Sequence, residues 1–454
     1  MSLLKKIEFV FESGAPKIID FRKSKNSFEH LDFSSFKGKL VFWPLNNSKE
    51  SILHLLSAIQ NRVVPIILSN RLNFEQTEKI KRDFPSFGFF DGNQIIANAE
   101  LSTAPQNVFL ALFTSGSTGE PKIVAATEDA LEKSILAINK SQNLNDVKST
   151  AVTLPLFYSY AFVNQLLWSI YFEQSLILTR GFTFLDNLFI KIQNHNAEML
   201  CLVNSQIKLV PDNYNHLPKL DCVKVINFAG GYFPIEEFNK LRDLFPNAKI
   251  INNYGCTEAM PRLTNILVDD ENYNINNVGK RIPGKEIRAV GNPSEIEFRG
   301  NSVSIGNINK DGFLMKNPEW IKSGDFGHLE NGCLIISGRA DQIVKIRGER
   351  ISTVPIEQKF LDLEGISNSI VFPFSDGKNQ DILCAVISGE KFPAKSDIQK
   401  SILSNLEYHS WLSKIYWIEE WPLNNNNKTD RFKIQNLAIQ NKLKTIWDIK
   451  DISL

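Results

Sequence analysis

The sequence predicts an α/β protein with a large N-terminal domain and a small C-terminal domain. Short apolar runs that are typical of buried strands alternate with helix-length amphipathic stretches through most of the 454 residues. Such alternation favours largely buried sheets, and this length allows two or more domains with substantial cores. We therefore expect stacked α/β sheet subdomains in the large domain.

The expected elements of the large domain follow in chain order. Strands are predicted at 40–42, 63–68, 108–113, 123–126, 150–154, 175–178, 199–203, 223–228 and 249–252. Helices are predicted at 50–60, 129–140, 185–195 and 235–245.

A boundary is predicted at Asp341, after a strand-rich region that ends with residues 332–337. The remainder has the pattern of a small α+β unit. Its predicted strands are 343–346, 369–372, 382–387 and 415–417, and its predicted helices are 354–361 and 397–406. The predicted domains are therefore 1–340 and 341–454.

Composition excludes several classes of function. The net charge of +1 gives no overall field that would attract nucleic acid. The five cysteines are scattered without a Cys-x-x-Cys pair, and the six histidines never cluster, which argues against a disulfide framework and a zinc site. The N-terminus lacks a signal-peptide pattern, and no stretch approaches the roughly 18 apolar residues of a membrane span. We expect a cytoplasmic protein with no membrane span.

Residues 113–122 read Phe-Thr-Ser-Gly-Ser-Thr-Gly-Glu-Pro-Lys, between two predicted strands. Glycine and small hydroxyl residues let the charged oxygens of a ligand approach the backbone N–H groups. Lys122 adds a positive charge that suits a polyphosphate. The pattern is not a Walker loop, because no Gly-Lys-Ser/Thr ends it. Taken alone, it is equally typical of a glycine-rich hairpin turn.

A second cluster, Asn253-Tyr-Gly-Cys-Thr-Glu258, follows the predicted strand 249–252. It supplies an aromatic face, a hydroxyl and a carboxylate at a strand end, where ligands bind in open α/β sheets. The alternative is an ordinary turn before a helix, with Thr257 as its N-cap.

Together these segments resemble the motifs of the adenylate-forming superfamily, which includes acyl-CoA and aryl-CoA synthetases, the adenylation domains of peptide synthetases, and luciferases. The family's phosphate loop, Thr-Ser-Gly-(Ser/Thr)-Thr-Gly-x-Pro-Lys, matches at every fixed position, and its Tyr-Gly-x-Thr-Glu motif matches residues 254–258. Its Thr-Gly-Asp motif is similar to residues 323–325, and its Gly-Arg-x-Asp-x-x-x-Lys pattern to residues 338–345. The resemblance covers roughly residues 40–435.

The resemblance implies an ATP site and a mobile C-terminal domain. Tyr254 would stack on adenine, Thr257 would contact the α-phosphate, Glu258 would hold Mg²⁺, and Asp325 would accept hydrogen bonds from the ribose hydroxyls. Asp341 would be the hinge about which the small domain rotates. The implied ATP-binding residues are Thr114, Ser115, Gly116, Ser117, Thr118, Gly119, Lys122, Gly230, Asn253, Tyr254, Gly255, Asp325, Arg339 and Lys345.

Lys428 is the implied catalytic lysine, together with Thr257 and Glu258. The segment from Pro422 to Arg431 is similar to the family's Pro-Leu-Thr-x-x-Gly-Lys motif, whose lysine bridges the substrate carboxylate and the α-phosphate. Here Asn427 replaces the glycine, and asparagine is the non-glycine residue best suited to a left-handed turn. A solvated lysine in an Asn-rich loop is the alternative, and Lys433 would then be the second candidate.

The acid to be activated is predicted to be apolar or aromatic rather than an α-amino acid. Tyr158 replaces a histidine that is usual in acyl-CoA synthetases. Amino-acid-activating relatives have an Asp near this point, whereas no Asp occurs between Asp146 and Asp186. The predicted pocket residues are Phe157, Tyr158, Phe162, Gly231 and Tyr232.

The implied function is that of an AMP-forming ligase. It would use ATP and Mg²⁺ to form an acyl-adenylate from a small carboxylic acid, and CoA or the phosphopantetheine thiol of an acyl carrier protein would accept the acyl group. The alternatives are a non-catalytic nucleotide-binding homologue, an amide-forming member and an oxidising member of the luciferase type.

Overall fold

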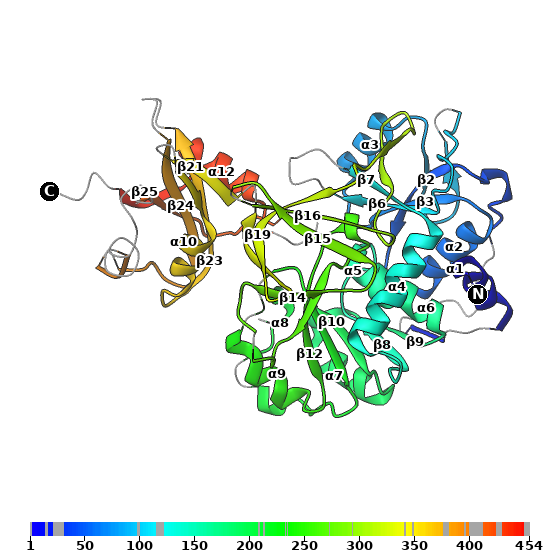
Figure 1. Ribbon diagram of the computed structural model, residues 1–454, viewed down its shortest axis with the longest axis horizontal. Coiled ribbons are helices and arrows are strands. Elements are labelled where there is room, and N and C mark those ends of the chain that lie inside the picture. The colour runs from blue at the N-terminus through cyan, green and yellow to red at the C-terminus, as the bar shows by residue number, and fades with distance from the viewer. Residues whose placement is uncertain are drawn as a thin grey trace. The chain divides into compact units, whose positions relative to one another are not determined.

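The chain divides into two compact units (Figure 1). The large unit comprises residues 1–288, 297–323 and 328–335, and the small unit comprises 289–296, 324–327 and 336–454. The computed structural model describes residues 2–13, 17–20, 31–97, 100–114, 122–207, 209–211, 214–231, 233, 235–271, 273–292, 294–339, 342–346, 349–375, 381–394, 396–398, 412–423 and 429–448.

The longer sheet has twelve strands in the order β1-β9-β8-β10-β11-β12-β13-β14-β20-β19-β16-β15. From β1 to β12 neighbouring strands are parallel, and β13, β14 and β20 then pair antiparallel. The parallel strands are β1 (Ile18–Asp20), β8 (Ser149–Val152), β9 (Ser175–Leu178), β10 (Met199–Leu202), β11 (Val225–Ala229) and β12 (Lys249–Tyr254). The others are β13 (Thr264–Leu267), β14 (Asn277–Arg281), β15 (Lys285–Val290), β16 (Glu295–Gly300), β19 (Ile321–Glu330) and β20 (Cys333–Arg339).

A second sheet of the large unit has eight strands in the order β18-β17-β7-β6-β3-β2-β4-β5. They are β2 (Leu40–Leu45), β3 (Val64–Ser69), β4 (Gly88–Phe90), β5 (Ile95–Ile96), β6 (Leu110–Thr114), β7 (Lys122–Ala126), β17 (Gly306–Ile308) and β18 (Leu314–Lys316). Strands β2 and β3 are buried almost throughout, as their continuous apolar runs predict.

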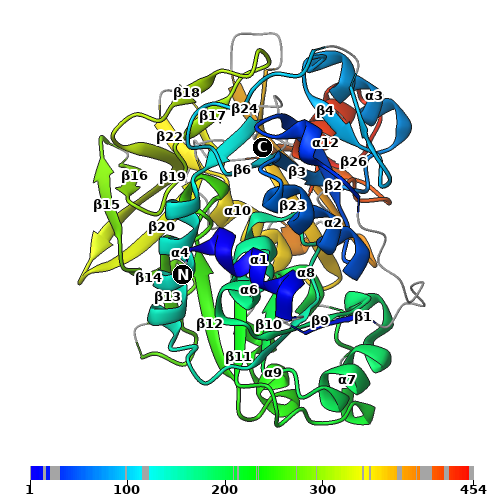
Figure 2. The ribbon, with the colours of Figure 1, turned by 90° about the vertical axis from the view of Figure 1, so that its right-hand side faces the viewer.

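The principal helices of the large unit are α1 (Leu3–Ser13), α2 (Lys49–Gln60), α3 (Phe74–Asp83), α4 (Glu128–Gln142), α6 (Trp168–Phe172), α7 (Leu185–Asn194) and α9 (Phe238–Leu244). Local signals set their ends: the Thr127 side chain accepts a hydrogen bond from the Ala130 N–H, and Asn143 ends α4 in the left-handed conformation. Helix α1, which the sequence did not predict, lies against α2, α4 and α6 (Figure 2). One hydrophobic core joins residues of these helices to residues of both sheets.

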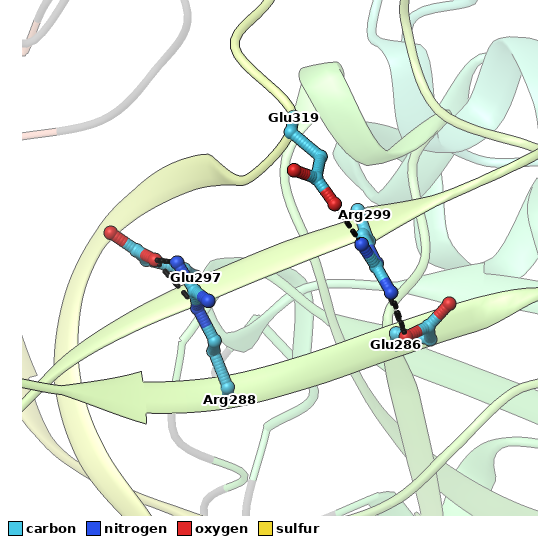
Figure 3. A network of polar contacts seen from close by, with 5 residues as sticks. All are labelled: Glu286, Arg288, Glu297, Arg299 and Glu319. Atoms are coloured by element: carbon cyan, nitrogen blue, oxygen red, sulfur yellow. Dashed lines mark hydrogen bonds and ion pairs between the residues drawn. The ribbon is translucent and has the colours of Figure 1, made fainter.

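Strands β15 and β16 carry a network of ion pairs in which Glu297 is buried and the other side chains are more exposed (Figure 3). Arg288 pairs with Glu297, and Arg299 pairs with both Glu286 and Glu319. Both guanidinium groups also lie over Trp320, at 4.1 and 4.5 Å from its ring centroid. Exposed ion pairs each contribute little to stability. The pairs Arg288–Glu297 and Arg299–Glu286 each join β15 to β16.

The small unit is built on a four-stranded sheet in the order β23-β24-β25-β26. Its elements are β21 (Ile343–Ile346), β22 (Glu349–Ser352), α10 (Val354–Leu361), β23 (Ile366–Ser375), β24 (Asp381–Gly389), β25 (Leu412–Trp417), α12 (Arg431–Ile439) and β26 (Lys444–Asp448). Buried side chains of α10, β24 and β25 form its principal core.

The predicted α/β architecture, with multi-sheet N-terminal part and smaller C-terminal sheet, is confirmed. The predicted helix 235–245 is divided into a 3₁₀ turn, Ile235–Glu237, and α9. The predicted helix 397–406 lies almost entirely outside the described residues. No helix within the described ranges is both long and apolar enough to cross a membrane.

Candidate active site

The predicted phosphate loop joins two strands of a buried hairpin. Strands β6 and β7 pair antiparallel, and their last pair is Thr114 with Lys122. Thr114 is half-buried and Lys122 is exposed. The loop residues Ser115, Gly116, Ser117, Thr118 and Gly119 lie outside the described residues.

Thr257 and Glu258 lie in a tight turn at the carboxyl end of β12. The turn is a 3₁₀ helix, Thr257–Ala259, in which the Met260 N–H donates to the Thr257 carbonyl at 3.1 Å. The Thr257 hydroxyl lies 3.2 Å from the Ser159 hydroxyl, so the turn faces the segment that carries the predicted acid pocket. This strand end is where an open α/β sheet binds ligands.

Three distant parts of the chain hold the backbone of this turn. The Ser304 N–H donates to the Glu258 carbonyl at 2.8 Å, and the Ser134 hydroxyl donates to the Met260 carbonyl. Lys285 is 1% exposed, and its ammonium group donates hydrogen bonds to the carbonyls of Ala259 and Ser302. Burial lowers the pKa of Lys285 to about 7.

Gly255 is required by a close approach of two backbones. A Cβ atom at Gly255 would lie 2.0 Å from the Pro261 carbonyl oxygen and 2.9 Å from the Arg262 Cα. The Leu263 N–H also donates to the Tyr254 carbonyl at 2.9 Å. Residues 254–263 therefore form one folded-back segment, with the half-buried Tyr254 at its start.

The Asn253 side chain is engaged inside the protein. Its amide group donates to the Asn227 side chain and to the carbonyls of Phe228 and Ile251, at 2.9 to 3.0 Å. Its oxygen accepts from the Gln142 side chain at 2.8 Å. These bonds tie β12 to β11 and α4, and a contact between Asn253 and ATP stays a prediction.

Two glycines follow β11 next to this strand end. Gly230 has φ of 88° and Gly231 has φ of 153°, both in the region that favours glycine. Tyr232 lies outside the described residues.

The predicted acid pocket begins with two aromatic side chains in contact. The rings of Phe157 and Tyr158 are 4.6 Å apart, and the Arg71 guanidinium lies 5.9 Å from the Phe157 ring. Burial raises the pKa of Tyr158 to about 12, so its hydroxyl is neutral at physiological pH. Phe162 is completely buried in the hydrophobic core, which is the ordinary role of an aromatic side chain.

In the small unit, the Arg339 guanidinium lies 3.6 Å from the Asp325 carboxylate. Asp325 is 7% exposed, and Gly324 beside it has φ of 76°. Lys345 lies on β21, opposite Arg350. The predicted hinge residue, Asp341, lies outside the described residues.

Lys428 also lies outside the described residues, but both ends of its loop are anchored. Leu423 and Thr429 pair as an isolated β-bridge, and the Trp421 indole N–H donates to the Thr429 hydroxyl at 3.1 Å. Beyond the loop, the Asp430 side chain accepts from the Lys433 N–H and caps α12. Lys433 itself is exposed in the first turn of that helix.

Sequence reasoning missed four residues beside the turn: Ser159, Tyr160, Arg262 and Lys285. Arg262 carried a recognisable signal, because it is a charged residue between Pro261 and Leu263, directly after the Tyr-Gly-x-Thr-Glu motif. Lys285 carried none, because a lysine after a turn glycine usually lies in solvent.

The described residues contain no group of three His, Cys, Asp or Glu that could hold a metal ion by themselves. Within the same residues, the Glu258 carboxylate has no ion-pair partner. A cavity of about 660 Å³ is lined by Ser304, Arg299, Lys316 and Asn317, among other residues. None of the predicted site residues lines this cavity.

Comparison with known proteins identifies related sequences. The family model described as "AMP-binding enzyme" matches residues 38–308. The D-alanine--D-alanyl carrier protein ligase of Bacillus cytotoxicus is 28% identical over 380 residues, which cover 76% of this chain and 74% of that protein. The ligase of the same name from Bacillus cereus is 28% identical over 381 residues, with the same coverage.

Solved structures share the fold. The o-succinylbenzoate coenzyme A synthetase of Bacillus subtilis in complex with AMP matches with a TM-score of 0.77 at 17% identity, covering 96% of this chain and 98% of that one. The anthranilate CoA ligase AuaEII in complex with anthranoyl-AMP matches with a TM-score of 0.76 at 15% identity, covering 97% and 98%. McyG A-PCP complexed with phenylalanyl-adenylate matches with a TM-score of 0.74 at 18% identity, covering 97% and 96%.

Proposed function

The chain belongs to the AMP-binding enzyme family, and from this premise we propose that it is an AMP-forming ligase that activates a carboxylic acid for transfer to a thiol. In the first step, a carboxylate oxygen of the acid attacks the α-phosphorus of ATP, and pyrophosphate leaves. In the second step, the sulfur of CoA or of a carrier-protein phosphopantetheine attacks the acyl carbon, and AMP leaves. The observation that carries the proposal is the turn at Thr257 and Glu258, which distant segments fix at a strand end.

Catalysis of the first step requires charge neutralisation and positioning, because two anions must meet in line. Thr257 is positioned for a polar contact by its turn and by Ser159. Lys428 would supply the positive charge at the α-phosphate. That role rests on the motif of residues 422–431, within which Leu423 and Thr429 pair with each other.

Glu258 would hold Mg²⁺. Proteins usually bind Mg²⁺ through one or two carboxylates and the phosphates of the substrate. A single carboxylate, in a described chain that has no group of three metal-binding side chains, fits this mode. Bound there, the ion would offset the negative charge of the phosphates.

We propose an acid with an apolar or aromatic body rather than an α-amino acid. The contact between Phe157 and Tyr158 supports an apolar wall. An α-ammonium group needs a carboxylate partner, whereas Tyr158 of the predicted pocket is neutral and the positive Arg71 lies 5.9 Å from the Phe157 ring. D-Alanine, which the similar ligases are named for, is therefore not the proposed substrate of this chain.

We also propose that the small unit rotates about Asp341 between the two steps, so that Lys428 serves adenylation and then withdraws. The division of contacts between residues 335 and 336 supports a hinge in this part of the chain. Asp325 and Arg339, paired within the small unit, would contact the ribose and phosphate.

The test is acid-dependent exchange of pyrophosphate into ATP, followed by product analysis with CoA and with a phosphopantetheinylated carrier protein. We expect Lys428→Ala to slow exchange by about 10²–10³-fold, as expected for loss of one key donor. Lys442→Ala is the matched control, because Lys442 is exposed in the same unit and should leave exchange unchanged.

Two outcomes would contradict the proposal. If Lys433→Ala, rather than Lys428→Ala, abolishes exchange, the catalytic lysine is wrongly assigned. If ATP binds but no acid in a panel of aryl, fatty and amino acids supports exchange, the non-catalytic homologue becomes the better description.

A further inference from the structure

Arg262 is a buried cation that interacts with the Tyr160 side chain but leaves most of its hydrogen-bonding capacity unused. The residue is 1% exposed, and its two terminal nitrogens, Nη1 and Nη2, have no hydrogen-bond acceptor in the described structure. A buried charge is strongly unfavourable unless it is paired and hydrogen-bonded, and arginine does not avoid this cost by losing its proton. An anion beside the Arg262 guanidinium would offset this cost.

The neighbours of Arg262 do not provide that anion. Its guanidinium carbon lies 5.4 Å from the centre of the Tyr160 ring, and the Tyr160 hydroxyl donates to the Asn227 carbonyl at 2.8 Å. The other titratable neighbour is Cys201. Burial raises the pKa of Tyr160 well above its ordinary value and that of Cys201 to about 12, so both are neutral at physiological pH. A cation–π contact compensates for only part of the lost hydration.

Arg262 also belongs to the segments that form the reaction site. Its backbone packs directly on Gly255, between the two halves of the folded-back segment 254–263. Its side chain contacts Tyr160, and the adjacent Ser159 contacts the Thr257 hydroxyl at 3.2 Å. The guanidinium and the reacting end of the site thus share the same two stretches of chain, 157–162 and 254–263.

We propose that Arg262 binds a second carboxylate of the acid substrate, so that the enzyme activates a dicarboxylic acid. This inference rests on the proposed ligase function. One carboxylate reacts with ATP near Thr257, the apolar body packs beside Tyr158, and the distal carboxylate accepts hydrogen bonds from Nη1 and Nη2. The planar guanidinium fork matches a carboxylate with two parallel bonds. The same charge repels an ammonium group.

The test compares dicarboxylic acids with their own monomethyl esters, which keep the body and remove the distal charge. The panel contains aliphatic diacids of increasing length and the aryl diacid o-succinylbenzoate. Wild-type protein is expected to use its best diacid at least about 10-fold better than the matching monoester, in kcat/KM for pyrophosphate exchange. Arg262→Met should remove this preference, and Arg262→Lys should retain part of it, because it keeps the charge and loses the fork.

Thermal unfolding gives a readout that does not depend on turnover. Without ligand, Arg262→Met should unfold at a higher temperature than wild type, because it removes an unpaired buried charge. The preferred diacid should raise the unfolding temperature of wild type and not that of Arg262→Met. Arg242→Met is the control, since Arg242 lies partly exposed on α9 and is already paired with Asp269.

The outcomes separate this inference from the proposed function. Equal use of diacids and monoesters by wild type, with active exchange, overturns the role of Arg262 and leaves the ligase intact. Stabilisation of wild type by a diacid that Arg262→Met does not share, without exchange for any acid, supports the anion site and overturns the ligase. A ligand-free Arg262→Met protein less stable than wild type would show that the guanidinium is already satisfied, and would overturn the inference.

Discussion

Replacing Lys285 by methionine should remove a pH-dependent part of the stability of the large unit. Methionine is close to lysine in length and has no charge. The lysine ammonium is buried against the backbone of the Thr257–Ala259 turn, where it donates to the Ala259 carbonyl at 2.7 Å. Burial lowers its pKa to about 7, from about 10.4 in the unfolded chain.

The direction in which stability changes with pH follows from the number of protons bound by the folded and the unfolded chain. Below pH 7, Lys285 is protonated in both states, and the cost of burying the charge is fully present. Between about pH 7 and 10, the folded protein releases this proton while the unfolded chain keeps it, so stability rises with pH. From pH 6 to pH 9 the gain is about 2–3 kcal/mol, which corresponds to an increase of about 4 °C in unfolding temperature for a unit of this size.

The assay is thermal unfolding of wild type and Lys285→Met at one scan rate, from pH 6 to pH 9. Other titrating groups affect both proteins alike, so only the difference is used. Cys256, whose thiol interacts electrostatically with Lys285, is controlled by Cys256→Ser in both backgrounds. Parallel pH profiles for the two proteins would refute the argument, because they would show that Lys285 keeps its proton in the folded state. Pyrophosphate exchange should also fall in Lys285→Met, because the Ala259 carbonyl loses its donor.

Two further predictions follow from single contacts. Gly255→Ala should abolish exchange and lower the unfolding temperature, because its Cβ would lie 2.0 Å from the Pro261 carbonyl oxygen; an active, equally stable variant would contradict this close approach. Glu357→Gln should destabilise the small unit by about 2–3 kcal/mol in urea unfolding, since this buried carboxylate accepts from both terminal nitrogens of Arg431 and from the Val371 N–H. The exposed Glu364→Gln is its control and should leave stability unchanged, and equal effects of the two variants would refute the argument.

Apolar continuity and turn chemistry made much of the fold predictable from sequence. The buried strands β2 and β3 and the amphipathic helix α2 were expected within one or two residues, except that β2 continues to Leu45. Helix α1 was missed because its four buried residues are interspersed with Lys5, Lys6 and Glu8, and packing on neighbouring helices stabilises it. A helix or strand is thus predictable where its own sequence pattern shows that it will be buried. It is less predictable where packing against distant segments stabilises it.

The same distinction applies to the site. Thr257 and Glu258 are recognisable because their motif is continuous in sequence. The residues that hold them, Ser134, Lys285 and Ser304, come from three distant elements and make main-chain contacts that no local pattern encodes. Asn253 illustrates the converse, because a motif residue can carry a core hydrogen-bond network through its side chain.

Arg262 lies in the folded-back segment 254–263, and Lys285, on β15, donates to the Ala259 carbonyl of the same segment. Both are buried cations, and their surroundings assign them different roles. The Lys285 ammonium has two carbonyl acceptors, so its function is complete within the folded chain and is to hold the turn. The Arg262 guanidinium has none at Nη1 or Nη2 in the described structure, although it is just as deeply buried. A protein retains such a cost when a bound ligand offsets it, because pre-placed donors then need no rearrangement on binding. The unsatisfied cation, rather than the satisfied one, is therefore where substrate specificity should be sought.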